Sequence, residues 1–334
     1  MTVSLNNGQQ RNAELGLKAD NGCKELLKPV CHCEQLSVSC VNAQYTDTDV
    51  FLNVGVHFSF LDSITFTGNN FRHLPKSVFG PSVQHSRLKT LNMSSNYLVY
   101  IDNDALTGMP NLRVLDLSGN MIELRLNDTG FLRLVPKLER LLLRKAFNTY
   151  GNRTRQSFLL EKVFREAKLR ELTNLDLSLN ELTTVPYKLG CYLPKLQHLN
   201  LRQNNLKTLN LDASCLPNVD TIDLRANSLT ELDPKFRQVA LQLADYSILA
   251  QNWFLCDCKS VAYINWVRET RKIQDKPLLR CYRASPAAYD KQKLVEVPVD
   301  KLDCSLNLNT GRTSALDLPF TAIFAALIAF FVLR

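Results

Sequence analysis

Apolar residues recur along this chain in an eleven-residue pattern, LxxLxLxxNxL, where x is any residue. Alternation in the middle of the pattern predicts a short strand that turns Leu, Ile or Val toward a core while its other residues face solvent. The clearest copies are Leu172-xx-Leu175-x-Leu177-xx-Asn180-x-Leu182, Leu196-xx-Leu199-x-Leu201-xx-Asn204-x-Leu206 and Val219-xx-Ile222-x-Leu224-xx-Asn227-x-Leu229.

The same frame fits three segments upstream: Leu61-xx-Ile64-x-Phe66-xx-Asn69-x-Phe71, Leu88-xx-Leu91-x-Met93-xx-Asn96-x-Leu98 and Leu112-xx-Leu115-x-Leu117-xx-Asn120-x-Ile122. Copies mostly about 24 residues apart are typical of leucine-rich repeats, which stack as a solenoid. We therefore expect an α/β solenoid, a horseshoe with a parallel β-sheet on its concave face. A solenoid offers a long surface for binding and no ready-made reaction pocket.

The asparagine of each copy is expected to be structural. Its amide is buried at a turn, where it satisfies backbone groups of neighbouring repeats, and losing one would cost about 1–3 kcal/mol for the partners left unsatisfied. These asparagines therefore receive no functional role.

The pattern weakens at Leu138-xx-Leu141-x-Leu143, where Ala146 takes the asparagine position. The following segment, 145–170, is first polar and then amphipathic, with Phe158, Leu159, Val163 and Phe164 on the apolar side. It predicts a loop and a short helix laid against the solenoid. The alternative is a merely degenerate repeat. Either way the repeats fall into two groups.

Two groups of four cysteines flank the repeats: Cys23, Cys31, Cys33, Cys40 and Cys256, Cys258, Cys281, Cys304. They resemble the capping modules of extracellular leucine-rich-repeat proteins, which cover the apolar ends of a solenoid. That resemblance implies bonds from Cys23 to Cys33, Cys31 to Cys40, Cys256 to Cys281, and Cys258 to Cys304. Sequence alone leaves three pairings open for each group. The alternative to disulfides is a zinc site. Zinc ligands usually come in pairs two to four residues apart, whereas the partners here are far apart, so no metal is expected.

Cys191 and Cys215 occupy nearly the same place in successive repeats. Neighbouring strands lie about 4.8 Å apart, which suits a disulfide; two buried free thiols are the alternative. Ten cysteines indicate an oxidising compartment. Sequons at Asn92, Asn127 and Asn152 agree, and a glycan on Asn92 would cover part of the concave surface.

We expect eight segments along the chain: a disordered stretch (1–22), an N-terminal cysteine cap (23–57), a first repeat group (58–144), the interruption (145–170), a second repeat group (171–251), a C-terminal cysteine cap (252–304), a linker (305–317) and an apolar tail (318–334). The tail resembles a glycosylphosphatidylinositol signal, with a short transmembrane helix as the alternative. No apolar secretion signal opens this sequence, which we attribute to a missing start; a cytosolic protein is the alternative.

The sequence carries no motif of catalysis or cofactor binding. Five histidines are dispersed, and no nucleophile elbow, phosphate loop or paired-carboxylate context occurs. We therefore expect neither an enzyme nor a cofactor. A formal net charge of +8 favours acidic partners such as sulfated glycans. The sequence does not interleave aromatic and basic residues as nucleic-acid binders do, so no nucleic-acid partner is expected.

The expected binding residues are outward positions of the strands and of the turns that follow them. In the later repeats a column of carboxylates stands beside a column of arginines, and these residues form either a docking patch or ion pairs between adjacent repeats. Leu142 stands out as an apolar residue on the exposed side beside the interruption. The candidates are Leu142, Arg144, His198, Arg202, Asp223 and Arg225.

Taken together, the motifs resemble the trophoblast glycoprotein family of cell-surface leucine-rich-repeat proteins, over roughly Cys31 to Cys304. The segments that carry the resemblance are CHCEQLSVSCVN, LDSITFTGNNFRHLPKSVF, LKTLNMSSN, GNRTRQSF and CDCKSVAYINWVRET. It implies an inhibitor of Wnt/β-catenin signalling at the outer face of the plasma membrane, binding a protein such as a Wnt co-receptor. Asn252-Trp253-Phe254 departs from the family's Asn-Pro-Trp. An adhesion or matrix-binding protein is the alternative.

Overall fold

The repeats build one ten-stranded sheet, in the order β1-β2-β3-β5-β7-β8-β9-β10-β11-β12. The computed structural model describes residues 26–58, 60–82, 84–148 and 153–304. β1 (His32–Glu34) and β2 (Ser37–Val41) are antiparallel, and each later strand adds in parallel. These are β3 (Ser63–Thr67), β5 (Thr90–Asn92), β7 (Val114–Asp116), β8 (Arg140–Leu142), β9 (Asn174–Asp176), β10 (His198–Asn200), β11 (Thr221–Asp223) and β12 (Tyr246–Ile248). The expected leucine-rich-repeat solenoid is therefore confirmed.

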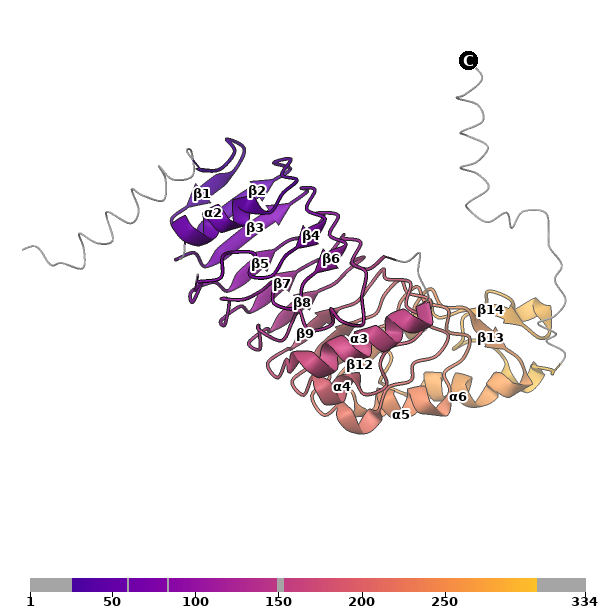
Figure 1. The fold of residues 1–334 in the computed structure, drawn as a ribbon. Helices are drawn as coiled ribbons and strands as arrows, with labels where there is room; N and C mark the ends of the chain where they lie inside the picture. The colour runs from indigo at the N-terminus through magenta and orange to yellow at the C-terminus, as the bar shows by residue number, and fades with distance from the viewer. Residues whose placement is uncertain (1–25, 59, 83, 149–152, 305–334) are drawn as a thin grey trace, which may run out of the picture.

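Helices cover the side away from the strand row, as Figure 1 shows for α3 to α6. They are α2 (Asp49–His57), α3 (Arg153–Ala167), α4 (Leu189–Tyr192), α5 (Pro234–Gln242) and α6 (Val261–Glu269). Two small parallel sheets pair β4 (His73–Leu74) with β6 (Tyr100–Ile101), and β13 (Phe254–Cys256) with β14 (Cys281–Ala284). Short 3₁₀ turns are η1 (Ala213–Cys215), η2 (Cys258–Ser260), η3 (Lys276–Leu278), η4 (Ala287–Tyr289) and η5 (Val299–Lys301). Helix α2, inside the N-terminal cap, was not expected from the sequence.

One continuous core fills the space between the sheet and the helices. The central residue of each repeat strand is almost fully buried, as in Leu115, Leu175 and Ile222. At the N-terminal end the core becomes aromatic, because Phe51 of α2 packs on the ring of Phe71 at 4.7 Å between centroids. The apolar end of the solenoid is thus closed by a helix as well as by disulfides.

The asparagines form a buried ladder, as expected. Those of the clear repeats are 0–5% exposed: Asn69, Asn96, Asn120, Asn180, Asn204 and Asn227. Asn204 shows the pattern, because its Oδ1 accepts hydrogen bonds from the backbone N–H groups of Asn180 and Leu182 at 3.1 and 2.9 Å. Its Nδ2 donates to the carbonyls of Leu177 and Leu201 at 3.0 and 2.9 Å. One side chain therefore ties the turns of two consecutive repeats together.

The ladder changes at Ala146, which has no amide to contribute. Asn180 of the following repeat accepts hydrogen bonds from the N–H groups of Ala146 and Phe147, at 2.9 and 3.2 Å. The interruption then forms α3, whose Leu159, Val163 and Phe164 are buried as expected. Phe158 differs from that expectation, since it is 58% exposed.

Polar contacts hold α3 on both sides. Glu166 accepts a hydrogen bond from the buried hydroxyl of Thr129 at 2.9 Å, and Lys162 Nζ donates to the carbonyl of Leu126 at 2.6 Å. On the other side, the hydroxyl of Tyr192 donates to Glu161 at 3.0 Å. The helix therefore bridges the two repeat groups.

One further repeat is less visible in the sequence. Strand β12 pairs with β11, and Ser247 takes the central buried position that leucine holds in other repeats. Its hydroxyl donates to the carbonyl of Lys272 at 3.0 Å, which satisfies a polar group in the core. Asn252 continues the ladder by donating to the carbonyl of Leu224 at 2.9 Å. A serine at the leucine position hides this repeat from the pattern.

Disulfides join Cys31 to Cys40, Cys256 to Cys281, and Cys258 to Cys304, which are pairs that the resemblance to capping modules implied. Cys33 is also disulfide-bonded, and its expected partner Cys23 lies outside the described residues. Cys191 and Cys215 are bonded, with Cα atoms 4.7 Å apart, rather than buried free thiols. This bond links α4 to η1, between successive repeats.

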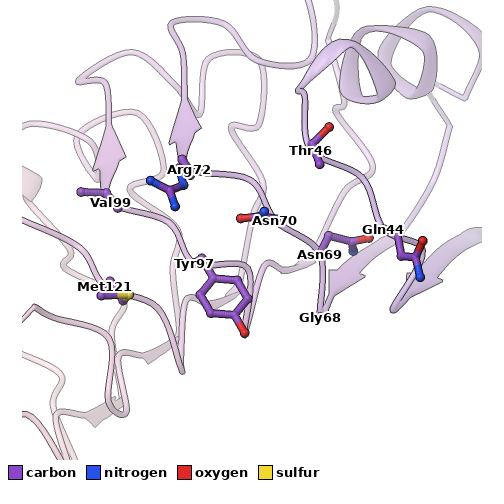
Figure 2. Close-up of a pocket in the computed structure, with 9 residues that line it drawn as sticks. All are labelled: Gln44, Thr46, Gly68, Asn69, Asn70, Arg72, Tyr97, Val99 and Met121. Carbon is purple, nitrogen blue, oxygen red and sulfur yellow. The ribbon is translucent and has the colours of Figure 1, made fainter. Parts of the chain in front are cut away.

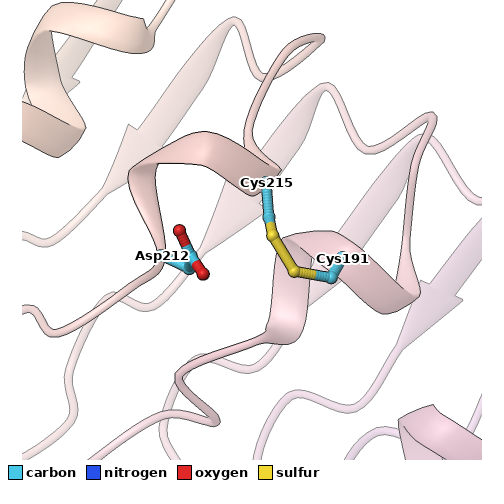
Figure 3. Close-up of side chains that lie close together, drawn as sticks. All are labelled: Cys191, Asp212 and Cys215. Atoms are coloured by element: carbon cyan, nitrogen blue, oxygen red, sulfur yellow. A yellow bond between two sulfur atoms is a disulfide. The ribbon is translucent and has the colours of Figure 1, made fainter.

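Asp212 lies beside the bond between Cys191 and Cys215, as Figure 3 shows. These three side chains would be a metal-type group by residue type and proximity. Both sulfurs are used in the disulfide, however, and a thiolate is the form that binds metal. Asp212 instead accepts hydrogen bonds from the N–H and hydroxyl of Ser214, at 3.1 and 2.6 Å.

Over the part of the chain that the structure describes, every helix is too short or too polar to cross a bilayer. The expected apolar tail (318–334), the linker (305–317), the N-terminal stretch (1–22) and the sequon at Asn152 lie outside the described residues.

Replacing Asn204 with alanine should lower the free energy of unfolding by about 1–3 kcal/mol, because backbone groups of two repeats lose their partner. Chemical denaturation followed by circular dichroism measures it. The control is Asn210→Ala at an exposed asparagine, for which no comparable loss is expected. Equal stability of the two variants would contradict a stabilising role of the buried asparagine.

The ring of His85 is fully buried, stacks edge-on against Phe79 at 5.3 Å, and has no hydrogen-bond partner for either nitrogen among the described residues. Burial lowers its pKa below the usual 6.5. The unfolded chain therefore binds a proton first as pH falls, so this contribution to stability is full above pH 6.5 and is lost below it.

We expect the His85→Phe variant to lose less stability than the parent between neutral pH and pH 5, by up to about 1.4 kcal/mol per pH unit. Parallel denaturant titrations over this range give the two slopes. The exposed His57, replaced by phenylalanine, serves as the control for the substitution itself.

Candidate functional site

The exposed face of the sheet carries two columns of side chains, set by the parallel register. Each strand contributes its first and third residues, so His198 lies level with Asn174 and Thr221, and Asn200 with Asp176 and Asp223. The first column runs Thr90, Val114, Arg140, Asn174, His198, Thr221 and Tyr246, and the second Asn92, Asp116, Leu142, Asp176, Asn200, Asp223 and Ile248.

Most of the second column is occupied in local turns. Asp116 Oδ1 accepts a hydrogen bond at 2.8 Å from the N–H of Ser118, two residues on, and Asp176 does the same with Ser178. Asn92, Asn200 and Asp223 repeat this geometry. Asn and Asp are suited to it because their short side chains reach their own backbone. The expected acidic column is therefore largely a set of strand-end turns, and Leu142 interrupts it.

The one arginine pair formed in this region lies within a repeat. Arg225 bonds to Asp223 through Nε at 3.0 Å and Nη2 at 2.5 Å, which raises the pKa of Arg225. The alternative of ion pairs between adjacent repeats is thus wrong for these two residues. Arg202 is half-buried, and its Nε has no partner among the described residues.

A shallow hollow of about 310 Å³ lies on the concave face over β8 to β12. It brings together Leu142, His198 and Asp223 from the expected set. His198 is exposed and its Nδ1 lies 2.9 Å from the hydroxyl of Thr221. Arg140, Asn174 and Ile248 also line the hollow. Apolar contacts and hydrogen-bonding groups side by side suit a folded protein ligand.

Sequence reasoning missed these last three residues for two reasons. Arg140 and Asn174 belong to the first column, where the sequence candidates included only His198, and the period-two alternation of a strand could have identified them. Ile248 comes from β12, whose repeat Ser247 obscures. The hollow thus extends one strand further than the visible pattern.

The remaining expected arginines lie elsewhere. Arg144 lines a second hollow of about 600 Å³ beyond the strand ends, with Lys145, Ser118, Glu181 and the sequon residue Ser94. Arg202 and Arg225 do not line the concave hollow. The six candidates therefore do not form one site.

A third hollow, of about 550 Å³, lies beside the turns of the first repeats (Figure 2). Arg72, Tyr97 and Met121 line it, and Tyr97 is 59% exposed. Tyr97 has φ of +60°, a left-handed conformation that is uncommon for a tyrosine. The repeat pattern gave no signal for it, because Tyr97 fills the unspecified position between Asn96 and Leu98.

Two sequons fall on described residues. Asn92 uses its Oδ1 in the turn to the N–H of Ser94 at 2.9 Å, so a glycan on its Nδ2 would leave that bond in place. Asn127 is exposed, whereas its partner Thr129 is buried against α3. Glycosylation at both stays a prediction.

Comparisons with known proteins identify the same repeats. A leucine-rich-repeat family model matches residues 59–122 and 170–229, and a second matches 111–135. Trophoblast glycoprotein of Mus musculus is 29% identical over 293 residues, covering 82% of this chain and 67% of the relative. That of Macaca fascicularis is 27% identical over 288 residues with the same coverage. Chaoptin of Drosophila melanogaster is 32% identical over 146 residues, 44% of this chain and 10% of its own length.

The fold has a close counterpart among solved structures. The crystal structure of human trophoblast glycoprotein, also called Wnt-activated inhibitory factor 1, superposes with a TM-score of 0.70. It covers 83% of this chain and 99% of that one, at 24% identity. At this identity the likeness concerns the fold.

The repeats, the buried ladder and the two caps define a leucine-rich-repeat protein. Its likeness is not limited to the repeats, because the match covers 82% of the chain. The chain is similar to trophoblast glycoprotein over most of its length and shares its leucine-rich-repeat fold.

Replacing Asp223 with alanine should lower the free energy of unfolding by about 1–2 kcal/mol, since both the turn and the pair to Arg225 are lost. Asp223→Asn keeps the turn acceptor and should recover part of the loss. Thermal and denaturant unfolding of the two variants measure the difference. Identical destabilisation by both substitutions would show that the turn bond contributes nothing.

Proposed function

We propose that this protein binds a protein ligand at the cell surface and thereby inhibits Wnt/β-catenin signalling. The observation that carries the proposal is the hollow on the concave sheet, where Leu142 and Ile248 add apolar contact beside His198. Similarity to trophoblast glycoprotein over 82% of the chain supports the signalling role. The human relative carries the further name Wnt-activated inhibitory factor 1.

Binding alone would perform this function. Residues that project from a rigid parallel sheet are held in register, so a ligand meets a preformed surface and few side chains must be ordered on association. Leu142 is suited to be an anchor because it is the one apolar residue among the turn-forming side chains between β7 and β11. Arg140 at the rim would contribute to partner orientation more than to affinity.

We further propose attachment to the outer face of the plasma membrane through the apolar segment 318–334, by a lipid anchor or a single span. Disulfides in both caps agree with an oxidising compartment. Glycans on Asn92 and Asn127, and a Wnt co-receptor as ligand, belong to the same proposal. Acidic glycans are a further class of partner, in view of the net charge of +8.

The Leu142→Glu variant should lose most of its inhibition in a cellular Wnt reporter assay, because a carboxylate would be desolvated at the centre of the contact. A loss of about tenfold or more in binding to a co-receptor ectodomain is expected in parallel. The matched control is Leu241→Glu, at a 59% exposed leucine on α5, which should keep inhibition.

Surface staining in the same cells separates loss of function from loss of folding. If the parent chain reaches the surface and leaves the reporter unchanged, the signalling proposal is wrong. Cell attachment to matrix that depends on Leu142 would then favour the adhesion alternative.

A further inference from the structure

The C-terminal cap exposes an apolar group that the concave face does not include. Trp253 and Tyr282 stack with ring centroids 5.2 Å apart and are 51% and 50% exposed. Leu278, at the end of η3, is 62% exposed and lines the same shallow groove as Tyr282. Three large side chains of this kind on one small cap mark an interaction surface. We call Trp253, Leu278, Tyr282 and the cations Arg280 and Lys291 the cap patch.

The charge of the cap patch is of one sign. Arg280 and Lys291 line its groove of about 320 Å³, and none of the nine lining residues is acidic. Both cations are exposed, and neither forms an ion pair within the described residues. Within the described part of the chain, the guanidinium of Arg280 donates to the carbonyl of Lys291, at 3.2 Å. Its remaining donors are available to an anionic group such as a phosphate.

The described part of the chain ends in this same cap. Cys304 is bonded to Cys258, and the N–H of Asp303 donates to the carbonyl of Ser285 at 2.9 Å, next to β14. The segment 305–317 then separates Cys304 from the apolar run that begins at Leu318. A linker of this length reaches at most about 45 Å when fully extended. A membrane that holds the apolar run would therefore stay within reach of the cap patch at high effective concentration.

We infer that the cap patch docks on the lipid surface of the membrane to which the chain is attached. The inference rests on the attachment that we propose above. Trp and Tyr favour the level of lipid headgroups because their rings are apolar and their edges polar. Leu278 reaches the acyl boundary, while Arg280 and Lys291 lie at the phosphates. Docking fixes the end of the solenoid against the bilayer and sets the direction in which the concave sheet faces.

The test uses the full chain, with its apolar C-terminal segment, reconstituted into phosphatidylcholine vesicles. Flotation on a density gradient first reports attachment. Tryptophan emission is then compared between ordinary vesicles and vesicles with brominated acyl chains, which quench rings that reach them. The chain has two tryptophans, and Trp266 packs against Phe236, so we expect a loss of up to about half of the emission.

Variants assign the signal to the cap patch. Trp253→Phe should remove the bromine-dependent loss, and Leu278→Glu should reduce it several-fold while flotation is unchanged. Leu241→Glu, at an equally exposed leucine on α5, should keep the full loss. Quenching of the Trp253→Phe variant as strong as the parent's would overturn the inference.

The remaining outcomes separate the two proposals. Chains that float but show no bromine-dependent loss would overturn docking and leave the attachment standing. Chains that do not float would overturn the attachment and docking together. Emission that changes with protein concentration and not with bromination would overturn docking in favour of a second copy on the patch.

Discussion

The fold depends on satisfying backbone groups at the turn that follows each strand. These turns lie at the edge of an apolar core, where an unpaired N–H or carbonyl costs more than most single contacts gain. One asparagine amide meets four such groups from two repeats, as Asn204 does with Asn180, Leu182, Leu177 and Leu201. Stacking order, strand register and the spacing of the outward columns all follow from that bond set.

Because each asparagine bonds to two neighbouring repeats, the repeats are stable only when stacked. The stack has two ends, and each would expose apolar core unless it were capped. At the N-terminal end α2 and the aromatic cluster around Phe51 close the core. At the other end β13, β14 and α6 do so, with two disulfides. The apolar core is covered at the interruption too, because α3 packs over core that a shorter repeat would leave exposed.

The fold could be predicted from sequence because leucine and asparagine positions have almost no freedom. The binding surface could not, since its residues are the ones that the repeat leaves unspecified. Asp176 and Asp223 look like docking charges in the sequence, but each serves a turn two residues on. Ile248 and the repeat of β12 were hidden by Ser247, whose burial depends on a carbonyl from Lys272. The bond that allows Ser247 to be buried joins residues far apart in the sequence, so the repeat pattern could not reveal it.

The repeat of β8 is exceptional at two positions at once. Leu142 replaces the turn-forming Asn or Asp of its neighbours, and Ala146 replaces the ladder asparagine. Without an asparagine amide at this position, the N–H of Ile122 in the preceding repeat donates to the backbone carbonyl of Ala146, at 2.8 Å. This repeat therefore tolerates change where its neighbours cannot, so divergent members of such a lineage would be expected to acquire new ligand specificity there first.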